Sequence, residues 1–85
     1  MVNYREMLLT LIGGDIERKY HVEVVEILSD VIFKEDKDDQ DYIDFSMTVR
    51  MMDEKDYEIR PYRVYGFISY LSRDIIIGER RLLAD

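Results

Sequence analysis

The chain has 85 residues and carries 19 Asp and Glu against 12 Lys and Arg, a formal net charge of −7 at pH 7. Hydrophobic residues make up 47% and charged residues 36%, which predicts one folded domain over residues 1–85 and excludes a disordered chain. The absence of Cys excludes a disulfide scaffold and a thiolate metal site, and a single His excludes a His-rich metal site. Because no signal peptide and no apolar run of about 20 residues is visible, we expect a cytoplasmic protein without membrane association.

The first predicted element is a helix over residues 3–12. Asn3 followed by Glu6 fits a variant of the capping box. Gly13-Gly14 predicts the end of the helix, since glycine adopts the left-handed conformation beyond a last turn. Apolar side chains between these signals recur at helical spacing: Tyr4, Met7, Leu8, Leu11 and Ile12.

Residues 15–33 fit two structures. An apolar stripe beginning at Ile16, with Asp15 as a possible N-cap, fits a second helix. The density of β-branched and aromatic residues over 20–33 favours a strand instead, and the apolar alternation changes phase between Val24 and Val25. A phase change inside a strand indicates a bulge. The strand is the preferred interpretation and the helix is the alternative.

The rest of the chain indicates strands separated by polar turns. Residues 42–52 alternate cleanly between apolar and polar side chains, as in a half-buried strand between acidic turns at 35–41 and 53–56. A further strand region follows at 57–71 and is expected to be broken or edged at Pro61. A short apolar run then ends at Gly78. Residues 79–84 are expected to form a last helical turn or a frayed tail.

These elements predict an α+β fold, with an N-terminal helix packed on an antiparallel meander of three to four strands. The alternative places two N-terminal helices beside a β-hairpin or meander.

The negative charge is concentrated in the middle of the chain. Residues 35–58 contain ten acids and three bases, a net charge of −7, equal to that of the whole chain. A strand over 42–52 would separate the two acidic turns by roughly 35 Å. That distance is close to one turn of duplex DNA, about 34 Å. The simpler interpretation is that the acidic turns only keep the protein soluble and monomeric.

The segment from Arg63 to Tyr70 resembles the RNP1 motif of the RNA-recognition motif family. Seven of its eight positions agree, and Val64 departs where the family has Gly. The resemblance implies that Tyr65 and Phe67 share one strand face and stack on unpaired bases. The simpler interpretation is a Tyr- and Phe-rich strand pairing within a sheet.

No motif for catalysis or metal binding is complete. The acidic run beginning at Asp36 lacks the Gly and Glu that a calcium-binding EF-hand loop requires at positions 6 and 12. Carboxylates in exposed turns do not acquire raised pKa values, and a phosphate-binding glycine motif is absent. The sequence therefore predicts a protein that is not an enzyme and that has no metal and no cofactor.

The clustering of Tyr and Arg predicts a contact surface, since both residue types are enriched in binding hot spots. Four tyrosines fall within residues 57–70, interleaved with Arg60 and Arg63. A single helix covers only one face of a sheet, which leaves the other face for a partner. Together with the acidic turns, the expected partner-binding residues are Asp36, Asp38, Asp39, Asp41, Asp44, Asp53, Glu54, Asp56, Tyr62, Tyr65 and Phe67.

Three functions fit these features. The first is a small acidic protein-binding module, in its sharpest form a viral (phage) or mobile-element inhibitor that mimics nucleic-acid charge and blocks a protein with a basic surface. The second is a single-stranded RNA-binding protein using Tyr65 and Phe67, although the acidic charge disfavours nucleic acid. The third is a homodimeric structural or adaptor subunit.

Overall fold

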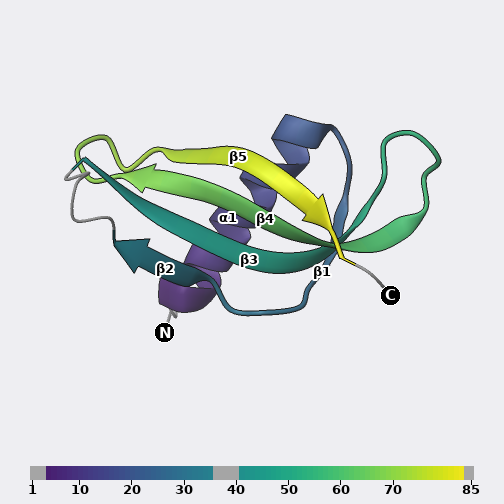
Figure 1. Ribbon diagram of the computed structural model, residues 1–85, viewed down its shortest axis with the longest axis horizontal. Coiled ribbons are helices and arrows are strands. Elements are labelled where there is room, and N and C mark those ends of the chain that lie inside the picture. Colours follow the sequence, from purple (N-terminus) through teal and green to yellow (C-terminus); the bar gives the residue numbers. More distant parts are fainter. Residues whose placement is uncertain (1–3, 36–40, 84–85) are drawn as a thin grey trace.

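The computed structural model describes residues 4–35 and 41–83. One helix packs on one face of an antiparallel sheet (Figure 1), which confirms the predicted α+β fold. The elements in chain order are α1 (Tyr4–Tyr20), β1 (Val24–Ile27), β2 (Ile32–Glu35), β3 (Tyr42–Met52), β4 (Ile59–Ser69) and β5 (Ile75–Leu82).

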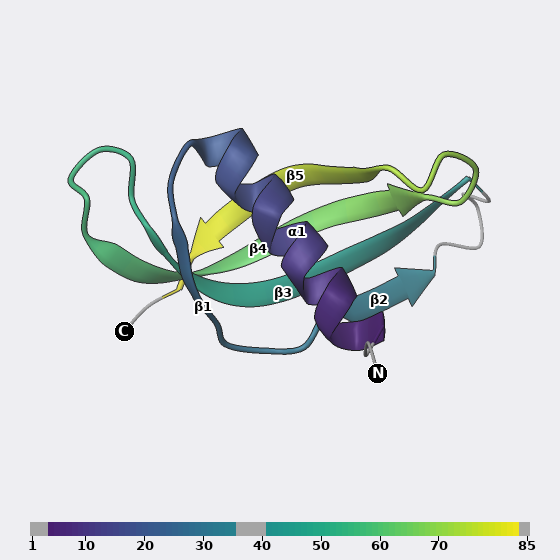
Figure 2. The same cartoon turned by 180° about the vertical axis from the view of Figure 1, so that it is seen from behind.

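The long strand β3 organises the sheet. The strand order is β1-β3-β4-β5, and β2 also pairs with β3, so that β1 and β2 lie one after the other along the same edge of β3. All pairings are antiparallel, and the central β3–β4 pairing places Met47 opposite Val64. The helix α1 crosses the strands behind the sheet in the view of Figure 1 and in front of it in Figure 2.

The helix is longer than the sequence predicted. The expectation that Gly13-Gly14 ends the helix is wrong, because α1 continues through both glycines to Tyr20 and neither has a positive φ. Each glycine inside a helix costs about 1 kcal/mol relative to alanine. Burial of Ile16, which lies beyond the glycines and has no exposed surface, outweighs that cost. In the described part of the chain, no helix is long and apolar enough to span a membrane.

The buried side of α1 differs in part from the predicted stripe. Ile12 is fully buried as expected, but Met7 and Leu11 are 43% and 52% exposed. The helix residues that pack against the core recur at four-residue spacing and include Leu8, Ile12 and Ile16. The predicted cap residue Asn3 and the side chain of Tyr4 lie outside the described part of the structure.

Residues 15–33 do not form the alternative second helix, and the preferred strand is present only in part. The helix occupies this region as far as Tyr20, and β1 and β2 follow as two short strands instead of one long strand. The expected irregularity is present, because the register of β1 against β3 shifts between Val24 and Glu26. The sheet consequently has five strands, one more than the upper number predicted.

The core lies between α1 and the strands. The predicted alternation of β3 is confirmed, since its odd-numbered residues from Phe45 to Met51 are buried. The buried residues are Ile12 and Ile16 from α1, Phe45, Met47, Val49 and Met51 from β3, Tyr62 and Val64 from β4, and Ile77 from β5.

Two expectations about the C-terminal strands are wrong. Pro61 does not break β4, because its carbonyl faces β5 and accepts a hydrogen bond from the Leu83 N–H at 3.0 Å. The N and O atoms of one strand residue point to the same side, so the proline removes no bond from the pairing with β3. Residues 79–82 form neither a helical turn nor a tail, since they continue β5 beyond an irregularity at Gly78.

Gly66 is required by the close approach of two neighbouring groups. A Cβ at this position would lie 2.8 Å from the Phe45 ring and closer still to the Ile76 carbonyl oxygen. The ring of Phe45 occupies the space above the glycine on the helix side of the sheet, directly opposite Gly66 in the β3–β4 register. No larger residue fits without moving the core.

We predict opposite effects for alanine at two glycines. Gly13→Ala should raise the free energy of unfolding by about 1 kcal/mol, because alanine favours the helix and a Cβ there meets nothing within 4 Å. Gly66→Ala should lower it by about 2 kcal/mol through overpacking. Urea unfolding followed by circular dichroism measures both, and equal effects of the two substitutions would contradict this account of the packing.

Candidate binding face of the sheet

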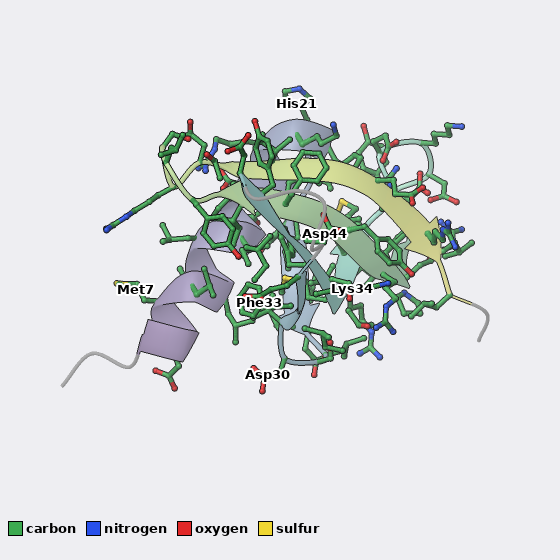
Figure 3. All side chains as sticks on the ribbon, turned by 60° about the vertical axis from the view of Figure 1, so that its left-hand side comes forward. Met7, His21, Asp30, Phe33, Lys34 and Asp44 are labelled. Atoms are coloured by element: carbon green, nitrogen blue, oxygen red, sulfur yellow. The ribbon has the colours of Figure 1, made fainter. Side chains whose placement is uncertain are left out.

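The face of the sheet opposite α1 is not covered by any described element (Figure 1). Side chains that alternate with the buried ones point to this face, which we call the open face. It carries Asp44, Ser46, Thr48 and Arg50 from β3 and Arg63, Tyr65 and Phe67 from β4. In Figure 3, Phe33 and Lys34 of β2 point to opposite sides of the sheet, and the register places Lys34 beside Asp44 on the open face.

A groove of about 600 Å³ lies at the centre of the open face. Gly66 lines the groove only with its backbone, and Gly78, whose Cβ would lie beside the Phe67 ring, adds no side chain to it. The lining also includes Ile32, Lys34, Asp44, Tyr65, Phe67 and Glu79. A concave, mainly apolar surface with a few polar groups is the usual form of a binding site.

Two aromatic side chains of β4 form the walls of the groove, and each has a carboxylate opposite it on a neighbouring strand. Phe67 lies opposite Asp44 of β3, and Tyr65 lies opposite Glu79 of β5. Phe67 is held by an edge-to-face contact with Tyr42, with ring centroids 5.7 Å apart. The walls are therefore fixed by strand pairing and by aromatic packing.

The open face continues into a more basic region beyond Tyr65. Arg63 and Arg81 lie opposite each other on β4 and β5, and the Arg81 guanidinium lies over the Tyr65 ring at 5.3 Å. Arg50 pairs with Glu26 at 3.0 Å. Four cations (Lys34, Arg50, Arg63 and Arg81) and three anions (Glu26, Asp44 and Glu79) share the face, so its charge differs from the net charge of −7 of the chain.

The acidic turn between β3 and β4 is largely neutralised within the protein. Arg60 forms hydrogen bonds with Asp56 at 2.6 and 2.9 Å and an ion pair with Asp53 at 3.6 Å. The hydrogen bonds from Arg60 and from the Glu58 backbone N–H lower the pKa of Asp56 to about 2. Backbone and Tyr62 hydrogen bonds likewise lower the pKa of Asp53. These carboxylates therefore serve to order the turn.

The third carboxylate of this turn is bound by Arg80 of β5. Nη2 of Arg80 lies 2.5 and 2.6 Å from the two oxygens of Glu54. The guanidinium is stacked between aromatic rings, 4.2 Å from the centroid of Tyr20 and 4.9 Å from that of Tyr62. Hydrogen bonding to Arg80 lowers the pKa of Glu54. Arg80 thus connects the end of α1, the β3–β4 turn and two strands.

Tyr62 belongs to the core and not to the partner-binding surface for which the sequence nominated it. It is 4% exposed, and its hydroxyl donates a 2.8 Å hydrogen bond to Asp53. Burial raises the pKa of this hydroxyl, and the Asp53 carboxylate acts in the same direction. The group therefore remains a hydrogen-bond donor at neutral pH.

The other acidic candidates lie at the opposite end of β3. Asp36, Asp38 and Asp39 fall outside the described residues. Asp41 is exposed, and its backbone carbonyl accepts a 2.9 Å hydrogen bond from the backbone N–H of Tyr70. Asp44 is exposed on the open face beside the groove. The structure thus brings Asp44, Tyr65 and Phe67 together and separates them from Asp53, Glu54 and Asp56.

The groove also contains residues that the sequence analysis did not nominate. Lys34 and Glu79 enter it because β2 and β5 flank the central strands, and that register was not readable from the sequence. Ser46 also lines the groove, and the only sequence signal for it was the polar half of the alternation over residues 42–52.

No family model, no curated protein and no solved structure matches the chain. Within the described residues there is also no group of three or more metal-ligating side chains suited to a metal ion.

We predict that Arg80→Met lowers the free energy of unfolding by about 2 kcal/mol, because it removes two cation–π contacts and the hydrogen bonds to Glu54. Arg80→Lys should recover less than half of the loss, since an ammonium group lacks the planar fork. Urea unfolding midpoints measure both effects. Full recovery by lysine would show that charge alone matters at this position.

The β3–β4 turn should also make stability depend on acid. The folded-state pKa of Asp56 is lowered from 3.8 to about 2, so its contribution is complete above about pH 4 and is lost as pH falls towards 2. We expect Asp56→Asn to reduce the loss of stability between pH 5 and 2, measured by urea unfolding. Glu58→Gln removes a carboxylate of the same turn without removing a partner of Arg60, and an equal effect would refute the assignment.

Proposed function

We propose that the protein is a small, non-enzymatic protein-binding module and that the open face is its contact surface. The observation that carries the proposal is the groove, in which Tyr65 and Phe67 form an apolar centre on a face that α1 does not cover. A binding surface typically has such an aromatic centre within a polar rim.

The composition of the surrounding face supports this role. Arg63 and Arg81 adjoin the aromatic walls, and Tyr and Arg dominate binding hot spots. Ile32 and Ile76 are 53% and 40% exposed on the same face. Exposed apolar side chains gathered around a groove are more typical of an interaction site than single scattered ones are.

The negative charge has a supporting role in this proposal. The carboxylates of Glu54 and Asp56 are hydrogen-bonded to the protein's own arginines, and that of Asp53 is ion-paired with Arg60. A row of free carboxylates spaced like phosphates therefore lacks support at this end of β3. The net charge of −7 still attracts a partner with a basic surface and accelerates association at low salt. The contact itself is assigned to the groove.

Single-stranded RNA binding is the second candidate. The observation that favours it is that Arg63, Tyr65 and Phe67 share the open face of a central strand, the arrangement that the RNP1-like segment implied. The net charge of −7 opposes it, because phosphate contacts depend on a basic surface.

Site-specific photo-cross-linking tests the proposed surface. A benzophenone side chain introduced at Ile32, one of the residues that line the groove, should form an adduct with a protein in extract of the source cells. The same group at Leu11 on α1 is the matched control, since these positions are 53% and 52% exposed. We expect Tyr65→Ser and Phe67→Ser each to reduce the Ile32 adduct at least tenfold, because hot-spot truncations cost about 2 kcal/mol or more and about 1.4 kcal/mol is a factor of ten in affinity.

The adduct also separates the candidate functions. A nuclease-resistant adduct with another protein supports the proposal. An adduct that disappears on ribonuclease treatment supports RNA binding, and one of twice the protein's mass supports a homodimer. Adducts from Leu11 but not from Ile32 would refute the open face as the contact surface.

A further inference from the structure

We infer that the groove on the open face binds an arginine or lysine side chain of the partner, between the aromatic walls formed by Tyr65 and Phe67 and the carboxylates of Asp44 and Glu79. This inference rests on the proposed function and adds the chemistry of the recognised group. Its support is the charge and geometry of the groove.

The strand register places a carboxylate beside each aromatic wall. Asp44 lies opposite Phe67 on one side of β4, and Glu79 lies opposite Tyr65 on the other side. All four residues line the same groove. Aromatic faces attract cations, and carboxylates accept hydrogen bonds from guanidinium or ammonium groups. An inserted basic side chain would satisfy both kinds of group at once.

The protein already shows this combination with its own arginines. Arg80 is stacked on two tyrosines and hydrogen-bonded to Glu54. Arg81 lies over the Tyr65 ring and within 3.5 Å of Glu79. Arg81 lies opposite Arg63 in the register and is not among the residues that line the groove, so the groove itself remains open.

The charges around the groove also favour a cation. Its lining has two carboxylates against the single ammonium of Lys34. In the described part of the chain Asp44 forms no ion pair, and the pair between Glu79 and Arg81 is exposed and weak. The groove volume of about 600 Å³ lies within the range of about 300–1,000 Å³ that accommodates small ligands.

The four glycines of the chain provide reporters for a nuclear magnetic resonance titration. Gly66 and Gly78 line the groove, whereas Gly13 and Gly14 lie in α1. The probe is the peptide acetyl-Gly-Arg-Gly-Arg-Gly-amide, added to ¹⁵N-labelled protein. We expect saturable shifts of the Gly66 and Gly78 amide signals and no shifts of the helix glycines. The same peptide with citrulline in place of arginine, which has nearly the same shape but no charge, should bind at least fivefold more weakly.

Substitutions identify the groups responsible. Asp44→Asn and Glu79→Gln should each weaken peptide binding about threefold to tenfold. Glu58→Gln, an equal change of charge in the β3–β4 turn, should change it less than twofold. Lys34→Met should strengthen binding about twofold or more, because it removes the cation that competes for the groove. Retention of the dispersed amide spectrum confirms that each variant is folded.

The inference is wrong if the peptide does not shift the Gly66 and Gly78 signals, or if the citrulline peptide binds equally well. It is also wrong if these signals shift with protein concentration alone, because that would indicate that a second copy of the protein fills the groove. Preferential binding of a single-stranded RNA oligonucleotide would overturn it as well. If the peptide does not bind while the Ile32 cross-link to a protein persists, the proposed function stands and only the inference that the groove binds a basic side chain is refuted. Loss of both refutes the two together.

Discussion

A single helix covers one face of this sheet, and the other properties of the protein depend on that constraint. The 17 residues of α1 extend about 26 Å, whereas the 11-residue strands β3 and β4 extend about 37 Å. Alternate side chains of the same strand therefore have different environments. Met47 and Val64 are fully buried beneath α1, while Ser46 and Tyr65 on the opposite face are available to other molecules.

The acidic side chains fall into two groups: some stabilise the fold through arginines, and others remain exposed. At the β3–β4 turn, Arg60 and Arg80 bind three carboxylates and join the turn to the strands and to the end of α1. At the groove, Asp44 remains exposed. Residues of the same chemical type thus have different roles, and the difference arises from which arginines the strand register brings close to them.

The sequence was sufficient to predict local patterns but not the pairing between distant segments. Alternation over 42–52 identified β3 and its two faces correctly. The RNP1-like segment implied one shared face for Tyr65 and Phe67, which β4 provides. The helix end was missed because the tertiary burial of Ile16 outweighs the local preference of two glycines. Tyr62 was misjudged because composition does not distinguish a core tyrosine from a surface one. Lys34 and Glu79 depend on register, which no local pattern specifies.

The edges of the sheet determine how the protein can associate with others. One edge is divided into β1 and β2, with four residues each, and β5 at the other edge has an irregularity at Gly78 and two consecutive arginines after Glu79. Short strands, bulges and charges are the features by which natural sheets prevent a foreign strand from continuing the hydrogen-bonded ladder. Neither edge is therefore a template for fibrous growth, and even a crowded solution of this tyrosine-rich protein should remain free of cross-β aggregates as long as the fold persists.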